Sequence, residues 1–420
     1  MAKIISQICF ESYSQFDDIG DLKRLELVLS GLDDEVLMIK LEKKRKNGRN
    51  DYPVRVMWNL IIAMKVFQHR SIESFRKELS RNKQLREICG LTDDIPRKHL
   101  VPTSGAFSRF IKLLKSEQEE VDKLFASLVE KLYEELPGFG ELIAGDGKYI
   151  DSYSKSSYSK PNPKAGDRAD NDAKRSIKEY HYTGSDGKRH TKKETHYGFK
   201  AHVVCDTRTE LPIAFSITPA NVDERKAMAE ILEAFPDAQK QKAYAIMMDR
   251  GYDSTKLIKQ IKNEGIIPII DIRNCWQDGE ETKQYKDTDL VYDYAGHVYY
   301  VDDTGNKHKM LYKGYDSKKK CLRYEYGDKI YRIYISYDER IFLPIARDSK
   351  KFKKLYKMRT SVERLNGRLD RDFMFEDHCL RGLAKTKLMV SLSFIVMNAM
   401  ALGKIKEGIS QGLAAHTKAA

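Results

Sequence analysis

Three acidic residues in three different local settings have the side chains that metal-assisted phosphodiester chemistry requires. Asp146 lies in IAGDGKYIDS and Asp249 in AIMMDRGYDS, so each follows a short apolar run and comes just before a glycine. Glu363 lies in YKMRTSVERLNGRL, a basic stretch with helical character. Two divalent ions about 3.5–4 Å apart can activate an oxygen nucleophile and stabilise the leaving oxyanion. Three carboxylates on rigid elements suffice to bind such ions.

Each of these acids also has a plainer interpretation. An aspartate after a strand is commonly a turn residue or a helix cap. A lone glutamate in a helix is commonly a solvent-facing partner in a salt bridge. The chemical interpretation therefore depends on whether Asp146, Asp249 and Glu363 converge in space.

The predicted elements around the acids would allow them to converge. A strand is expected from Leu142 to Asp146, and an apolar strand over residues 243–248 leads to Asp249. Carboxylates at the ends of two inner strands can point into one cleft. One helix is expected from Ser349 to about residue 371, and it would bring Glu363 to the cleft from the side.

The remaining pattern predicts a mixed α/β fold with additions. Strands and helices alternate from Gly198 to Ile270, beginning with a hairpin of antiparallel strands at 199–206 and 211–218. The polar stretch from Ser152 to Thr195 is typical of a long loop. The expected divisions are an N-terminal helical domain at 1–135, a core at 136–274 and 345–405, a β-rich insertion at 275–344, and a C-terminal tail at 406–420.

The N-terminal helices leave two interpretations open. Helices are expected at 53–67, from Ser71 as a helix cap, and from Thr103. Helices that are joined by short turns and carry Arg and Lys can include a helix-turn-helix DNA reader. A plain helical bundle has the same pattern, because no particular recognition helix stands out.

Composition favours a soluble protein with a polyanionic partner. The 420 residues include 75 Lys and Arg against 62 Asp and Glu, a net charge of +13. Such a balance favours nucleic acid or an anionic membrane surface as the partner. The six cysteines contain no C-x-x-C pair, which disfavours a zinc site and a disulfide framework and favours the cytosol. No secretory signal is evident, and the apolar run at 388–402 is shorter than the ~20 residues of a membrane span, so we expect a buried helix.

The order of the motifs resembles that of DDE-type transposases from bacterial insertion sequences, in the group whose third acid lies in a Y-x2-R-x3-E motif. Here that motif is Tyr356, Arg359 and Glu363. Asp249 begins a match to the family's D-x-G-Y pattern, and Asp146 begins a looser match at the first acid. The resemblance covers most of residues 50–402. Further similar stretches are Asp51-Tyr52-Pro53, 104–110, 196–202, 211–214 and 218–223.

This resemblance implies an RNase H-like catalytic fold in which Asp146, Asp249 and Glu363 bind metal. It implies Mg²⁺, with Mn²⁺ as a substitute, and a reaction that cleaves DNA at element ends and joins it to target DNA. The implied partners are double-stranded DNA, as terminal inverted repeats and as target, and a second copy of the chain on paired ends. The implied location is the bacterial cytoplasm, at the nucleoid, with no membrane association.

The third motif also predicts contacts to DNA. At i, i+3 and i+7 of one helix, Tyr356, Arg359 and Glu363 would share a face. Tyr356 and Arg359 would then contact phosphate near the cut, although a salt bridge from Arg359 that orients Glu363 is an equal alternative. Further candidates for DNA contact are Lys148, Lys200, Arg250 and Arg368.

One position departs from the family's pattern. Members commonly place a lysine seven residues after the glutamate, and this chain has Asp370 there, between Arg368 and Arg371. An arginine one turn away could supply the cation. Two other functions remain open: a transposon-derived DNA-binding protein that has lost catalysis, and a metal-dependent nuclease that hydrolyses DNA without joining it.

Overall fold

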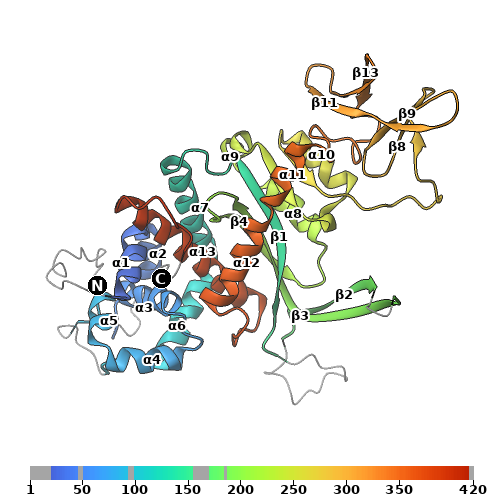
Figure 1. The fold of residues 1–420 in the computed structure, drawn as a ribbon. Helices are drawn as coiled ribbons and strands as arrows, with labels where there is room; N and C mark the ends of the chain where they lie inside the picture. Colours follow the sequence, from blue (N-terminus) through green and yellow to red (C-terminus); the bar gives the residue numbers. More distant parts are fainter. Residues whose placement is uncertain (1–19, 46–50, 93–98, 155–169, 184–186, 416–420) are drawn as a thin grey trace.

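The structure, a computed structural model, describes residues 20–45, 51–92, 99–154, 170–183 and 187–415. Figure 1 shows a cluster of N-terminal helices, a twisted central sheet flanked by helices, and a separate group of small strands at the far end. The expectations that fall on residues 1–19, on 155–169 and on 416–420 lie outside the described residues.

In the described part of the chain before the first strand there are seven α-helices, with α3 at their centre. Every residue of α3 is buried, and Ser71 and Thr103 cap α4 and α6 by accepting hydrogen bonds from the backbone N–H of Ser74 (3.1 Å) and Ala106 (3.2 Å). The helices predicted at 53–67, from Ser71 and from Thr103 are confirmed. The elements are α1 (Leu22–Gly31), α2 (Glu35–Arg45), α3 (Val54–Val66), α4 (Ile72–Arg81), α5 (Lys83–Ile88), α6 (Ser104–Ser116) and α7 (Gln118–Glu135).

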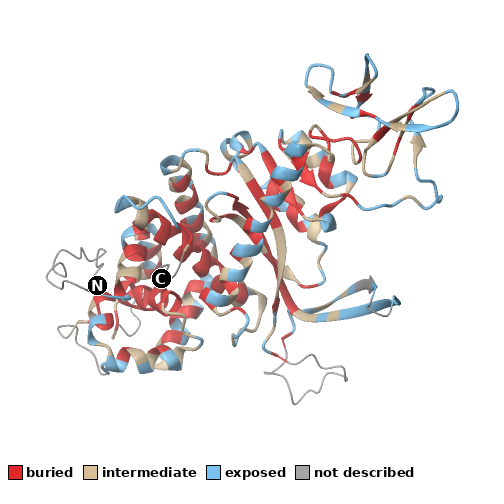
Figure 2. Cartoon of the chain, viewed as in Figure 1, coloured by how far each residue is buried: buried red, intermediate tan, exposed pale blue. Residues whose placement is uncertain are grey.

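The last helix, α13 (Leu383–Lys406), joins the N-terminal helices to the rest of the chain. It packs against α1, α3, α6 and α7 and against strand β4 (Pro212–Pro219). Among the described helices it is the one long and apolar enough to cross a membrane, but 89% of its apolar window is buried inside the fold. Figure 2 shows this burial along the helix. Its apolar character is therefore that of a core helix, and it is weak evidence for a membrane span.

The central sheet is mixed, which confirms the predicted α/β class. Its order is β2-β3-β1-β5-β6, with β4 also paired to β3. Strands β1, β5 and β6 are parallel neighbours, and the β1–β3, β2–β3 and β3–β4 pairs are antiparallel. The other strands are β1 (Leu142–Asp151), β2 (Lys174–Thr183), β3 (Arg189–Asp206), β5 (Ala245–Met248) and β6 (Ile267–Ile270).

Helices cover both faces of this sheet. Because successive residues of a strand face opposite sides, Gly145 and Gly147 of β1 lie against α8 (Glu224–Glu233), while Asp146 and Lys148 contact α12 (Thr360–Phe373). The remaining helical elements are α9 (Asp237–Lys242), the short 3-10 helix η3 (Arg250–Tyr252), α10 (Thr255–Asn263) and α11 (Lys350–Lys357).

Three sequence predictions need correction. Strand β1 continues five residues past Asp146, because β3 pairs with it as far as Asp151. Much of the predicted loop at 152–195 is the β2–β3 hairpin, which extends from the sheet in Figure 1 and lacks an apolar face because both faces meet solvent. The expected helix at 349–371 is two helices, since the N–H groups of Met358 and Arg359 bond three residues back and tighten the turn.

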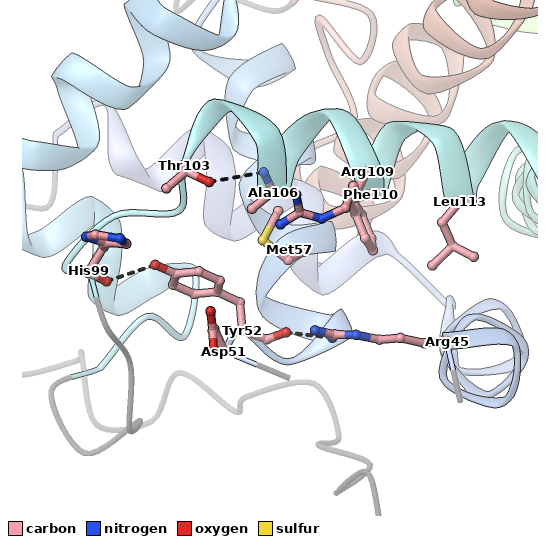
Figure 3. A pocket seen from close by; sticks show the side chains of 10 residues that line it. All are labelled: Arg45, Asp51, Tyr52, Met57, His99, Thr103, Ala106, Arg109, Phe110 and Leu113. Atoms are coloured by element: carbon pink, nitrogen blue, oxygen red, sulfur yellow. Dashed lines mark hydrogen bonds between the residues drawn. The ribbon is translucent and has the colours of Figure 1, made fainter. Parts of the chain in front are cut away.

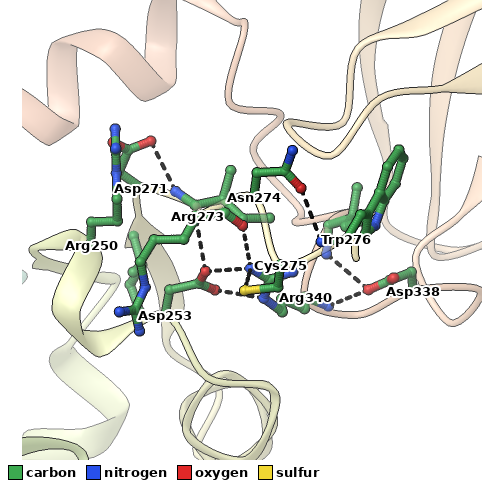
Figure 4. A network of polar contacts seen from close by, with 12 residues as sticks. Arg250, Asp253, Asp271, Arg273, Asn274, Cys275, Trp276, Asp338 and Arg340 are labelled. Atoms are coloured by element: carbon green, nitrogen blue, oxygen red, sulfur yellow. Dashed lines mark hydrogen bonds and ion pairs between the residues drawn. The ribbon is translucent and has the colours of Figure 1, made fainter. Parts of the chain in front are cut away.

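The β-rich segment has its own hydrophobic cluster and two small sheets, ordered β10-β9-β8-β7 and β11-β12-β13. Its strands are β7 (Lys283–Gln284), β8 (Leu290–Tyr292), β9 (Val298–Val301), β10 (Lys307–Lys309), β11 (Leu311–Asp316), β12 (Cys321–Tyr326) and β13 (Lys329–Tyr334). Buried Asp253 anchors the segment by accepting two hydrogen bonds from Arg340, at 3.0 and 2.6 Å (Figure 4). Arg340 also donates to the carbonyl oxygen of Arg273 at 2.6 Å.

The contact between α1 and α13 leads to a stability prediction. A Cβ on Gly403 would overlap the carbonyl oxygen of Leu27, so Gly403→Ala must push the two helices apart. We expect a loss of at least about 3 kcal/mol in the free energy of unfolding, measured by urea denaturation. Gly367→Ala in α12 is the control: nothing lies within 4 Å of its added Cβ, and it should stabilise by about 0.5–1 kcal/mol. Equal effects of the two substitutions would contradict the close helix contact.

Candidate active site

Asp146 and Asp249 lie at the same level of adjacent strands. The parallel register of β1 and β5 pairs Leu142 with Ala245 and Ala144 with Met247. Continued by two residues, the same register brings Asp146 level with Asp249, with both side chains on one face. Asp249 also caps η3, because its Oδ1 accepts a hydrogen bond from the N–H of Gly251 at 2.7 Å.

The charges of neighbouring acids affect Asp146. Its pKa is raised to about 6: burial is the main cause, the negative charges of Asp249 and Glu224 add to the rise, and the backbone N–H of Gly147 and the charge of Arg359 oppose it. Burial also raises the pKa of Tyr252, with Asp146, Glu224 and Asp249 adding to the shift. The site therefore concentrates negative charge that the protein itself does not neutralise fully.

Helix α12 packs against β1 and β3 and contacts Asp146. Asn366 donates a hydrogen bond from Nδ2 to Oδ2 of Asp146 at 3.2 Å. Glu363 lies one turn earlier on the helix, and spacing of i and i+3 puts it on the same side. Its carboxylate does not turn toward the aspartates but pairs with Arg359, at 2.7 Å between Oε1 and Nη2. Within the described ranges, no three His, Cys, Asp or Glu side chains lie close enough together to hold a metal ion.

Tyr356 and Arg359 remain neighbours despite the break between the helices. Tyr356 lies in the last turn of α11, Arg359 precedes α12, and the guanidinium lies 5.9 Å from the centre of the tyrosine ring. Glu363 has 48% of its side chain exposed and Arg359 20%. The salt-bridge alternative for Arg359 is thus the arrangement present here, and a phosphate contact stays a prediction.

The other predicted DNA contacts are each held by an acid. Lys148 pairs with Asp370 at 2.6 Å, so the acid that stands in place of the family's lysine faces a lysine from β1. Lys148, Lys200 and Arg368 are largely buried, so direct contact with DNA would require them to leave their partners, whereas Arg250 is exposed. The remaining pairs are Lys200 with Glu224 (2.8 Å), Arg250 with Asp271 (2.9 Å) and Arg368 with Glu210.

The donor set fits a hard divalent cation. Asp146 and Asp249 offer carboxylate oxygens, and Oδ1 of Asn366 is buried with no hydrogen-bond partner in the described part of the chain. Oxygen ligands of this kind suit Mg²⁺ and Mn²⁺. A cation there would also offset the repulsion between the two aspartates, so these residues would hold it.

A separate hollow lies among the N-terminal helices (Figure 3). It has a volume of about 470 Å³ and an apolar floor that includes Met57 and Phe110. Arg45 closes one side by donating to the carbonyl oxygen of Tyr52 at 2.6 Å, and the exposed Arg109 lies along the rim. The hollow therefore combines basic and apolar surface.

Comparison with known families decides the assignment. A family described as a transposase DDE domain matches residues 172–399, more than half of the chain, and a transposase domain of the DUF772 type matches residues 14–113. The chain belongs to the DDE transposase family. This confirms the resemblance drawn from the motifs, and the pairing of the two domains is typical of bacterial insertion-sequence transposases. The family implies an enzyme that cleaves DNA and transfers strands, and its members normally use divalent metal ions.

Two further comparisons add little to the family match. No curated protein matches the chain. A solved structure similar to this transposase is the "piggyBac transposase synaptic complex with hairpin DNA". Its TM-score is 0.38 at 10% identity, with 93% of this chain and 77% of that chain covered. A likeness this weak supports no argument.

Sequence reasoning missed two residues at the site. Asn366 could have been found from its spacing, since it lies three residues after Glu363 on a helix predicted to approach the aspartates. Glu224 was not recognisable, because it begins α8 far along the chain from Asp146 and reaches it only through the glycine face of β1.

The raised pKa of Asp146 predicts a pH-dependent stability. The folded state holds its proton up to about pH 6, whereas the unfolded chain loses it near pH 4, so ionisation costs folding energy as pH rises through this window. Asp146→Asn should therefore be more stable than the parent chain by about 1–3 kcal/mol at about pH 7.5 and lose that advantage near pH 4. Urea denaturation at both pH values measures this.

Asp237→Asn is the control, because this aspartate is exposed on α9 and should leave the pH profile unchanged. Added Mg²⁺ should raise the melting temperature of the parent chain and not that of Asp146→Asn. A parent chain and an Asp146→Asn variant with parallel pH profiles would contradict the electrostatic account.

Proposed function

We propose that this transposase has an RNase H-like core in which Asp146, Asp249 and Glu363 bind two divalent metal ions. The reaction is cleavage of DNA at the ends of an insertion sequence, followed by attack of the freed 3′-hydroxyl on target DNA. The observation that most strongly supports this is the parallel register of β1 and β5, which when extended aligns Asp146 with Asp249, next to the contact of α12 with Asp146. The position of Glu363 on the same helix adds the third acid.

The bound ions would supply activation of the nucleophilic oxygen and stabilisation of the leaving one. The protein's own contribution is orientation. Asn366 holds one oxygen of Asp146, and the N–H of Gly251 holds one oxygen of Asp249. Both carboxylates are thus fixed in direction by groups on rigid elements, which is the condition for precise placement of a reacting phosphate.

Glu363 must be released from Arg359 before it can join the aspartates. A phosphate of the DNA backbone is a suitable competitor for Arg359, because a guanidinium forms bidentate pairs both with phosphates and with carboxylates. We infer that DNA binding draws Arg359 and Tyr356 to a phosphate and frees Glu363 for metal. The substrate would thereby complete the site.

The remaining parts of the proposal follow from the family and the charge. Residues 1–135 would form a DNA-binding domain, and Arg109 at the rim of the hollow in Figure 3 is a candidate contact. Residues 136–274 and 345–405 would be the catalytic core, with 275–344 as its insertion. Double-stranded DNA, a homodimer on paired ends, and a bacterial cytoplasmic location complete the proposal.

Substitution of each acid tests the proposal. Asp249→Asn and Glu363→Gln should each reduce cleavage of terminal-repeat DNA at least about a hundredfold, because each removes a charged metal ligand. Binding of the same DNA, measured by fluorescence anisotropy, should persist. Asp237→Asn is again the matched control and should cleave normally. Full cleavage by Glu363→Gln would remove that residue from the triad.

A strand-transfer assay separates the transposase from its two rivals. Pre-cut terminal DNA incubated with a plasmid target and Mg²⁺ should give joined product. Hydrolysis without joining would instead indicate a nuclease, and binding without either reaction would indicate a DNA-binding protein that has lost catalysis.

A further inference from the structure

A buried lysine lies in a cavity at the junction of the N-terminal helices and the end of α12. Lys65, in the last turn of α3, is 9% exposed and lines a cavity of about 300 Å³. Its amine lies 5.1 Å from the centre of the Phe375 ring. An aromatic face does not satisfy the three N–H donors of an ammonium group. A buried amine of this kind is costly to the fold unless something pairs with it.

The cavity gathers further positive groups around Lys65. Lys385 enters from the first turn of α13, and no described residue offers either lysine a carboxylate partner. His378 also lines the cavity, and its Nδ1 accepts a hydrogen bond from the N–H of Leu380 at 3.1 Å. The proton of a neutral His378 is therefore on Nε2, where it can be donated to a ligand.

The other charges of the cavity are already paired. Arg70 is bound to Asp377 at 2.9 Å, and Glu73 to Arg76 at 2.8 Å. Glu73 is the one acid among the described residues that line the cavity. The local field is consequently positive: burial and then Lys385 lower the pKa of Lys65 to about 7, and burial and then Lys65 lower that of His378.

We propose that this cavity is a phosphate-binding pocket, in which Lys65, Lys385 and His378 take one phosphate group of the DNA substrate. The chemistry fits an oxyanion, because two amines and one imidazole line the same cavity and neither amine has a carboxylate partner among the described residues. The volume fits a small tetrahedral group with water. The inference rests on the proposed action on DNA.

The position of the pocket fits a backbone that also passes the acids. Phe373, the last residue of α12, lines the cavity, and Glu363 lies ten residues earlier on the same helix. At 1.5 Å per residue this separation is about 15 Å, or about four base-pair steps of DNA. The pocket would therefore hold a phosphate a few nucleotides from the reacting one and fix the register of the DNA over the aspartates.

The test begins with inorganic phosphate and the full chain in the absence of DNA. Phosphate should raise the melting temperature above that in KCl of equal ionic strength, and Lys65→Met and Lys385→Met should abolish the rise. Lys65→Met should fold at least as stably as the parent, because it replaces a buried amine by an apolar group of similar length. Lys259→Met is the control, since this lysine is exposed on α10, outside the proposed DNA-binding domain, and it should keep the rise.

The second arm measures binding of a labelled terminal-repeat duplex as a function of salt. Loss of one phosphate contact should make the slope of log K against log [KCl] shallower by about one unit in Lys65→Met, and the slope should be unchanged in Lys259→Met. A neutral methylphosphonate linkage moved along the duplex should weaken parent binding at one position and have no effect there on Lys65→Met. If the parent and Lys65→Met differ in binding only when the duplex carries a 5′-phosphate, the pocket takes a terminal phosphate.

The outcomes separate this inference from the proposed function. No effect of phosphate on melting, together with an unchanged salt slope, would overturn the pocket whether or not the chain cleaves DNA. A phosphate effect without any change in DNA binding would overturn its assignment to the DNA substrate. A positive result in both arms alongside failed cleavage would keep the pocket and count against the proposed reaction.

Discussion

Two like charges held side by side on neighbouring parallel strands are the constraint on which the rest of the site depends. The register of β1 and β5, extended by two residues, puts Asp146 and Asp249 at one level, and burial of Asp146 disfavours its charged form. Desolvation and like-charge repulsion both lower stability and persist only because the surrounding structure offsets them. The largely buried α13 and the parallel strands β5 and β6 provide that support. A site of this kind is arranged for a cation.

The segment that begins with Asp249 joins this site to the β-rich insertion. The charge of Asp249 acts on Asp146, Tyr252 lies buried under the glycine face of β1, and Asp253 accepts the two hydrogen bonds from Arg340. Five consecutive residues thus contact the site, the sheet and the insertion. A displacement of the insertion would be transmitted to this segment through Arg340. The D-x-G-Y segment therefore connects the site to the insertion, in addition to supplying Asp249.

Most helices and strands were predicted from the pattern of neighbouring residues. The features that this pattern did not predict are set by contacts between segments that are distant in the sequence. Apolar strands and capped helices could be predicted because their signals are local: Ser71 caps a helix by bonding to Ser74, and residues 53–67 form one largely apolar run. The extension of β1 beyond Asp146 depends on β3, some fifty residues away, and the β2–β3 hairpin has no buried face to leave an apolar alternation. Lys65, which lies in a largely apolar helix, was not singled out from the sequence, because only the folded chain brings Lys385 and His378 into the same cavity.

The distribution of paired charges indicates how substrate would change the site. Near the acids, Lys148, Lys200, Arg359 and Arg368 are all bound to carboxylates, so each pair is close to neutral and adds little to the net charge of +13. DNA phosphates can pair with these cations only by displacing the carboxylates that hold them now. The same exchange would free those carboxylates. Glu363 is the acid for which release has a chemical use. In the proposed mechanism, the ion pair with Arg359 would keep Glu363 away from the aspartates until a phosphate replaces it.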